Sequence, residues 1–290
     1  MIRKQAESIA SSIARRVSGA FGNVYTGLIF FFLYAPIAVL IIFSFNASKS
    51  RTIWAGFTLD WYIKLFQDSG IMDAFGTTIL VSVLAAAIST VAGTVAAVGL
   101  QNLRRRPRSI LMAVNNIPIT NADIITGVSL MLLFVSAGKL MGFTLGFGTL
   151  LMAHITFDLP YVILSVTPKL RQLDKHTFEA AQDLGATPFQ AFRKVILPEI
   201  RPGVVNGLII AFTMSIDDFV ISYFTAGSRV ETLAMAIYSM TRKRINPEIN
   251  ALSTILFVSV LTLLIIVNVR QARQERLAEA AMLKPPEEEV

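Results

Sequence analysis

The chain contains no cysteine and only two histidines among its 290 residues. The first absence excludes disulfides, thiolate catalysis and cysteine-held zinc or iron–sulfur sites, and two histidines are too few for a metal site made of histidine alone. The sequence also lacks the GxxxxGK[ST] phosphate loop, the GxSxG nucleophile turn and the HExxH zinc motif. It therefore shows no nucleotide-binding motif and no pattern typical of a hydrolase.

Charged residues are scarce too, at 16% of the chain against about 25% in ordinary soluble domains. Hydrophobic residues make up 54%, and the mean hydropathy is +0.61. These residues collect in blocks long enough to cross a hydrocarbon core about 30 Å thick, which takes about 20 helical residues. The sequence therefore predicts an all-α, polytopic membrane protein.

Six of these blocks are predicted to span the membrane, at 25–45, 77–99, 110–136, 145–166, 202–224 and 252–269. The first is longer than the apolar part of a secretory signal, about 7 to 15 residues, and has no convincing small-residue cleavage site. We therefore predict that it is retained. The expected organisation is a cytoplasmic segment (1–24), a six-span domain (25–269) and a cytoplasmic tail (270–290).

The basic residues predict which side each loop faces. With six spans both termini lie on one side, and that side would carry 18 of the 26 lysines and arginines. The positive-inside rule therefore places both termini in the cytoplasm. Arg242, Lys243 and Arg244 would face outward in this topology, against the rule.

The two ends of the chain are more polar than the spans. Residues 1–20 mix basic and apolar residues at roughly helical spacing, which fits an amphipathic helix on the membrane surface or a disordered basic tail. Residues 284–289 read KPPEEE and are predicted to be frayed, because they have little apolar surface to bury. The net charge of +7 does not indicate a nucleic-acid partner, because no binding motif accompanies it.

The loop between the fourth and fifth spans has the most specific pattern, and residues 179–198 read EAAQDLGATPFQAFRKVILP. The pattern predicts a first helix that ends at Gly185, since glycine accepts the left-handed conformation found at helix ends. Asp174 or Thr177 would cap its start. Thr187 would cap a second helix that has Pro188 in its first position.

Leu197 and Pro198 are expected to end this second helix and turn the chain back toward the membrane. The two helices would form a compact knob that fits a groove of a soluble partner, although an ordinary amphipathic loop between spans is the alternative.

These residues resemble the EAA loop of ABC-importer permeases, whose pattern is Glu-Ala-Ala, three residues, Gly, nine residues and Ile-x-Leu-Pro; Val195 alone departs from it. The resemblance implies a type I, MetI-like permease fold. It also implies that the loop 174–201 docks on an ATP-binding subunit and transmits its closure to the membrane helices. The coupling residues carried over are Glu179, Ala180, Ala181, Gly185, Leu197 and Pro198.

Three further stretches, 215–222, 237–240 and 246–252, are similar to the second permease of spermidine/putrescine importers. This resemblance implies import of polyamines across a bacterial cytoplasmic (inner) membrane. The implied partners are a homologous second permease, two copies of an ATP-binding subunit that uses ATP and Mg, and an extracytoplasmic substrate-binding protein. This chain itself would bind no cofactor. Importers of other small cationic or opine-like solutes share parts of these stretches, so such a substrate is an alternative.

Carboxylates inside the spans are the candidate substrate residues: Asp123, Asp158, Asp217 and Asp218. An ionised group at the bilayer centre costs at least about 2.5 to 3.5 kcal/mol, so such groups usually face a bundle interior or a wet cavity. Acids along a pathway would replace the lost hydration of a polyamine with charge-assisted hydrogen bonds.

Each acid also has a local alternative. Asp123 could cap a helix segment, and Asp158 could satisfy backbone groups freed by Pro160. Of Asp217 and Asp218, one could face the pathway while the other contacts a neighbouring helix or caps a break.

Aromatic residues near the outer end are the last candidates. Tyr223, with Phe224 and Tyr238, offers cation–π surfaces to an amine, or these rings are interfacial anchors. His154 is predicted to be a packed polar residue, and His176 a solvated loop residue. Two rival functions stay open: a secondary transporter, in which the acids bind the coupling ion, and an intramembrane enzyme, for which the sequence shows neither a nucleophile with its base nor a metal site.

Overall fold

The computed structural model describes residues 2–48, 53–174, 176–243 and 247–282. In chain order the helices are α1 (Ile2–Ser44), α2 (Asp60–Gln67), α3 (Ser69–Gln101), α4 (Arg105–Thr120), α5 (Asp123–Met141), α6 (Phe147–Gln172), α7 (Thr177–Asp183), α8 (Pro188–Ala191), the π-helical turn η1 (Phe192–Ile196), α9 (Leu197–Ile216), α10 (Val220–Thr225), α11 (Leu233–Lys243) and α12 (Glu248–Met282). Six helical segments are long and apolar enough to span a membrane: Val24–Ser44, Ser69–Gln101, Asp123–Met141, Phe147–Gln172, Pro188–Ile216 and Glu248–Val269. The all-α class and the predicted number of spans are confirmed.

Contacts divide the chain into two units, Met1–Leu65 with Arg244–Phe257 and Phe66–Lys243 with Val258–Val290. In the first unit α1 is unbroken, so the basic N-terminal segment is helical and continuous with the first span. Trp61 donates its indole N–H to the carbonyl of Asn46 at 2.7 Å. This hydrogen bond holds α2 against the residues that follow α1.

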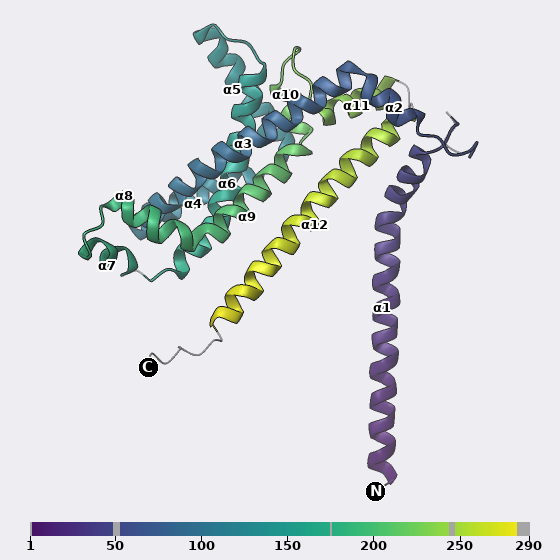
Figure 1. Ribbon diagram of the computed structural model, residues 1–290, viewed down its shortest axis with the longest axis horizontal. Coiled ribbons are helices and arrows are strands. Elements are labelled where there is room, and N and C mark those ends of the chain that lie inside the picture. The colour runs from purple at the N-terminus through teal and green to yellow at the C-terminus, as the bar shows by residue number, and fades with distance from the viewer. Residues whose placement is uncertain (1, 49–52, 175, 244–246, 283–290) are drawn as a thin grey trace, which may run out of the picture. The chain divides into compact units, whose positions relative to one another are not determined.

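Helices α3, α6 and α9 form the core of the second unit (Figure 1). A β-carbon on Gly93 of α3 would lie only 2.7 Å from a methyl of Val162 on α6, so the glycine is needed for this close approach. Val81 packs with Leu150 twelve residues earlier on the same two helices. The constant offset means that α3 and α6 run parallel.

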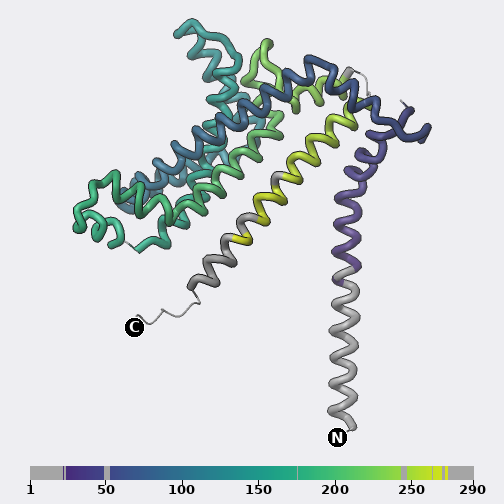
Figure 2. Tube along the Cα trace, viewed as in Figure 1, coloured from purple at the N-terminus to yellow at the C-terminus, as the bar shows by residue number. Residues whose placement is uncertain are grey.

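Helix α9 runs antiparallel to α6 beside the same core, as the trace in Figure 2 also shows. Gly207 packs on Val162, whereas Ser215, eight residues later, is hydrogen-bonded to His154, eight residues earlier. Asp158 lies midway between these two contacts, and its side chain is therefore held inside the three-helix core.

The third span differs from the prediction. Residues 110–136 are not one helix, because α4 ends at Thr120 and α5 begins at Asp123. The Thr120 hydroxyl donates to the carbonyls three and four residues earlier, and Asn121 and Ala122 are extended. Short polar side chains compete for backbone groups in this way and favour a helix end. Only α5 is long and apolar enough to span.

The fifth span, predicted at 202–224, is also interrupted, because α9 ends just before Asp217. The Asp218 carboxylate accepts the backbone N–H groups of Ile221 at 3.3 Å and Ser222 at 2.8 Å. These are two of the first N–H groups of α10, which have no carbonyl partner within that helix. The hypothesis that one of the paired acids caps a break is confirmed for Asp218.

Other helix ends lie beyond their predicted positions. Helix α3 begins at Ser69 because Asp68 caps it, accepting the N–H groups of Gly70 and Ile71. Helix α12 continues to Met282. The predicted frayed stretch 284–289 lies outside the described residues.

Candidate functional site

The loop between α6 and α9 folds as the predicted pair of helices, which we call the elbow (177–196). Helix α7 ends with two hydrogen bonds, from Gly185 N–H to the Gln182 carbonyl at 2.8 Å and from Ala186 N–H to the Ala181 carbonyl at 3.1 Å. This pair defines a Schellman motif. Gly185 has φ +87°, where a β-carbon is strained, so the glycine fixes the turn as predicted.

The second helix of the elbow also begins as predicted. The Thr187 hydroxyl accepts the Gln190 N–H at 3.3 Å, while the Gln190 side-chain oxygen accepts the Thr187 N–H at 3.0 Å. This is a capping box, with Pro188 at the first helical position. The turn between the helices is therefore fixed by local bonds.

The expected helix end at Leu197 and Pro198 is wrong. Instead, α8 passes through η1 directly into α9, and the Leu197 N–H bonds to the Phe192 carbonyl five residues earlier. Proline has no N–H and its ring collides with the preceding turn of an α-helix. The wider π turn just before Pro198 accommodates this collision, so the helical backbone continues.

The elbow exposes a carboxylate and two large apolar side chains. Leu184 is 90% exposed and Phe189 69% exposed. The Glu179 side chain is 71% exposed and meets His176 at 3.2 Å, which confirms His176 as a solvated loop residue. Of the other predicted coupling residues, Ala180, Gly185 and Pro198 are exposed, while Ala181 and Leu197 are partly covered. Leu197 packs against the bundle core.

A cavity of about 460 Å³ lies between the elbow and the ends of α3 and α6. Its lining includes Val98, Gln101, Leu170, Phe178, Glu179 and Phe192. The elbow is therefore not packed tightly against the bundle, and it has room to move toward it.

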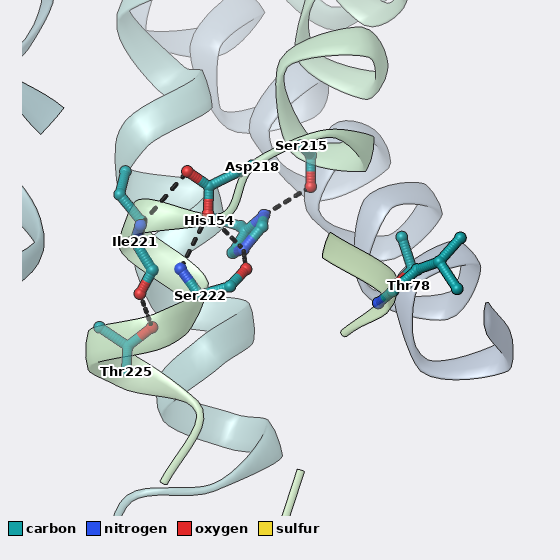
Figure 3. Close-up of polar contacts among 8 residues, drawn as sticks. Thr78, His154, Ser215, Asp218, Ile221, Ser222 and Thr225 are labelled. Atoms are coloured by element: carbon teal, nitrogen blue, oxygen red, sulfur yellow. Dashed lines mark hydrogen bonds and ion pairs between the residues drawn. The ribbon is translucent and has the colours of Figure 1, made fainter. Parts of the chain in front are cut away.

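A buried polar cluster joins α6 to the break between α9 and α10 (Figure 3). His154 Nδ1 lies 2.6 Å from the hydroxyl of Ser215, and Nε2 lies 3.0 Å from the hydroxyl of Ser222. Nε2 is also 3.6 Å from the Asp218 carboxylate. The cluster thus ties both sides of the break to α6, and we call it the clasp (His154, Ser215, Asp218, Ser222).

We expect His154→Leu to destabilise the chain. Leucine has a similar size but leaves the buried Ser215 and Ser222 hydroxyls without the imidazole, at about 1–3 kcal/mol for each unsatisfied group. The thermal unfolding midpoint of the purified chain in detergent measures the loss. Adding Ser215→Ala and Ser222→Ala should recover part of it, because removing both partners is cheaper than removing one. An unchanged midpoint in His154→Leu would contradict the role of the clasp.

Asp158 is fully buried, and neither of its carboxylate oxygens has a hydrogen-bond partner. The alternative that it satisfies backbone freed by Pro160 is therefore not supported. The helix registers place small Ser89 of α3 and Ala211 of α9, both fully buried, at the same level. The chain thus carries an unpartnered acid where its three core helices meet.

A cluster of aromatic side chains lies beside the break between α9 and α10. The rings of Phe219 and Tyr238 are 4.5 Å apart, and Tyr223 lies 5.4 Å from Phe219 and 6.2 Å from Tyr238. The Arg242 guanidinium lies over the Tyr238 ring at 4.9 Å. Tyr223 is 52% exposed, and Asp217, two residues before Phe219, is exposed. We call Phe219, Tyr223 and Tyr238 the aromatic site.

The structure therefore separates the predicted acids. Asp218 belongs to the clasp, Asp217 lies beside the aromatic site in sequence, and Asp158 is in the core. Asp123 begins α5, exposed, and the helix shows no side-chain cap bond there, so its predicted capping role is not supported.

Sequence reasoning placed His154 correctly as a packed residue but missed it as the centre of a cluster. Ser215 and Ser222 flank Asp218 within an apolar stretch, which is the pattern that would have pointed to partners for a histidine in a span. Within the described residues, no group of three or more His, Asp or Glu side chains is arranged to hold a metal.

Six apolar helices, an exposed elbow between two of them and acids at a helix break are typical of a polytopic membrane transport component. The chain belongs to the family of binding-protein-dependent transport system inner membrane components, which it matches over residues 89–279. The predicted family is confirmed.

Curated relatives agree with this membership. The chain is 42% identical over 230 residues to the putrescine transport system permease protein PotI of Escherichia coli K12, covering 78% of this chain and 82% of that protein. It is 38% identical over 253 residues to the spermidine/putrescine transport system permease protein PotC of the same strain, covering 87% and 93%.

Solved structures show the same fold. A bacterial ABC transporter involved in import of the acidic polysaccharide alginate matches with a TM-score of 0.68 at 17% identity, over 89% of this chain and 96% of that chain. The MetNI methionine ABC transporter matches with a TM-score of 0.53 at 18% identity, over 71% and 98%. The predicted MetI-like permease fold is confirmed.

Proposed function

We propose that this chain is a transmembrane permease subunit of an ATP-driven ABC importer that moves polyamines inward. The elbow is the observation that carries the proposal. Hydrogen bonds within the elbow fix its shape, and Leu184 and Phe189 are nevertheless exposed on it. Exposed apolar side chains on a preformed element are typical of a protein–protein contact. The names of the relatives support a polyamine as the substrate.

The elbow docks on a separate ATP-binding subunit, because the chain has no nucleotide-binding motif of its own. ATP and Mg are used by that subunit, and ATP hydrolysis belongs to it. Two copies serve this chain and a homologous second permease, and an extracytoplasmic binding protein delivers the substrate. Both termini and the elbow face the cytoplasm of a bacterium, as the basic residues predict.

Transport follows alternating access. Closure of the ATP-binding pair moves the elbow, the cavity behind it allows the movement, and the continuous helix from α8 to α9 passes it to the clasp. The bundle then opens outward. A secondary transporter gives no reason for an exposed, preformed elbow, and this favours the ATP-driven reading.

The substrate passes near the helix break. Asp217 supplies a carboxylate and the aromatic site supplies ring faces, which together bind alkylammonium groups by charge-assisted hydrogen bonds and cation–π contacts. Asp158 joins the pathway when the core helices separate. Asp218 acts through the clasp, and Asp123, at the exposed start of α5, is a further candidate.

The test is uptake by the importer reconstituted in liposomes with its partner subunits and ATP. Unlabelled putrescine, spermidine and spermine should each compete with radiolabelled putrescine, whereas uncharged 1,4-butanediol, which has the same chain length as putrescine, should not. Competition by butanediol, or uptake without ATP, would refute a cation-selective, ATP-driven importer. Competition by an opine but by no polyamine would favour the alternative substrate class.

A further inference from the structure

Arg242 is one of the three basic residues that oppose the positive-inside rule, and its contact with Tyr238 gives it a local partner. The two residues are four apart on α11, so they lie on the same face of the helix. The guanidinium carbon is 4.9 Å from the ring centroid, within the range of cation–π attraction. The exposed arginine therefore occupies one face of the aromatic site.

The ring face of Tyr238 that holds this guanidinium attracts cations in general, because the face of an aromatic ring carries negative charge. Phe219, from the break, and Tyr223, from α10, join Tyr238 in one cluster. Two segments, residues 219–223 and α11, thus bring their rings together, and the guanidinium rests on one of these rings, that of Tyr238. An alkylammonium is smaller than a guanidinium and is attracted to a ring face by the same quadrupole.

Two cations cannot share one ring face without repulsion at such short range. We propose that Arg242 is a resident cation that closes the aromatic site until an ammonium group of the substrate displaces it. The inference rests on the proposed function, because it takes the substrate to be an alkylammonium. It makes Arg242 a specificity-determining residue: a neutral solute gains nothing at this site that would offset the loss of the arginine contact.

Equilibrium binding of radiolabelled putrescine to the purified importer complex tests the displacement. Arg242→Met keeps the length of the aliphatic stem and removes the charge, so putrescine should bind about two- to fivefold more tightly, the factor that corresponds to one exposed cation–π contact. Arg242→Lys should resemble the wild type. Arg229→Met is the matched control, because Arg229 is an exposed arginine in the connection between α10 and α11, and it should leave the affinity unchanged.

A second substitution separates displacement from a general charge effect. In a Tyr238→Leu background Arg242→Met should have no effect, whereas in Tyr238→Phe, which keeps a ring, the gain should persist. Equal affinity in Arg242→Met and wild type, weaker binding, or an equal gain in Tyr238→Leu would overturn the inference. A wild-type complex that imports no amine would instead refute the proposed function, so the two failures are distinct.

Discussion

Glu179→Ala is expected to reduce ATP-driven uptake to background while the chain stays folded. The Glu179 side chain is mostly exposed and its contact within the chain is to His176, itself exposed, so its removal costs the fold little. The carboxylate matters instead when docking buries it against a cationic group of the partner, because truncating one side of a buried charge pair costs about 2–5 kcal/mol. The measurement is uptake per copy of reconstituted complex, with thermal stability recorded in parallel.

His176→Ala is the matched control, because it breaks the same 3.2 Å pair but leaves the carboxylate in place. If Glu179 only orients His176, both variants lose the same activity. If it contacts the ATP-binding subunit, only Glu179→Ala fails. Undiminished uptake in Glu179→Ala, and in the double variant with Gly185→Val that also strains the Schellman turn, would refute the coupling role of the elbow.

Asp158→Asn is expected to stabilise the protein and to impair transport. A buried carboxylate without a partner carries the desolvation penalty of a charge, on the order of several kcal/mol, and a neutral amide of the same shape avoids part of that penalty. The thermal midpoint of the purified chain should therefore rise, by roughly 2–4 °C for each kcal/mol. Uptake should fall several-fold, because the amide no longer offers a charge to an ammonium group once the core helices separate.

Asp217→Asn is the control for this prediction, since Asp217 is exposed and the same change there should leave the midpoint unaltered. A lower midpoint in Asp158→Asn would mean that the carboxylate has a stabilising partner in the assembled importer. Unchanged uptake would remove Asp158 from the substrate pathway.

The elbow was the part of the structure that sequence reasoning predicted best. The stop at Gly185 and the cap at Thr187 depend on bonds between residues at most five apart, and such bonds follow from residue type. The spans followed from apolar length alone. The resemblance to ABC-importer permeases also rests on residues 179–198, because so many fixed residues at a fixed spacing leave few other families as alternatives.

What sequence reasoning missed depends on contacts between distant residues. Ser215 and Ser222 lie 61 and 68 residues from His154, so the serines that flank Asp218 indicate a polar cluster but do not show that His154 completes it. The paired acids showed that a break was possible but not where α9 would end. At Pro198 the usual rule that proline ends a helix was applied, and the π turn overrode it.

The π turn keeps the backbone helical from the elbow into α9, so in the proposed mechanism a movement of the elbow is carried along one helix. From Pro188 to Ile216 the 29 residues form one continuous helical backbone, which bends at the π turn (Figure 1) and measures about 44 Å along its axis at 1.5 Å per residue. In the proposed mechanism an ATP-binding subunit in the aqueous phase therefore acts on the break between α9 and α10 without entering the bilayer. On that proposal, movement of the elbow reaches the far end of α9, where Ser215 is hydrogen-bonded to His154, and the backbone bends at the break that follows Ile216.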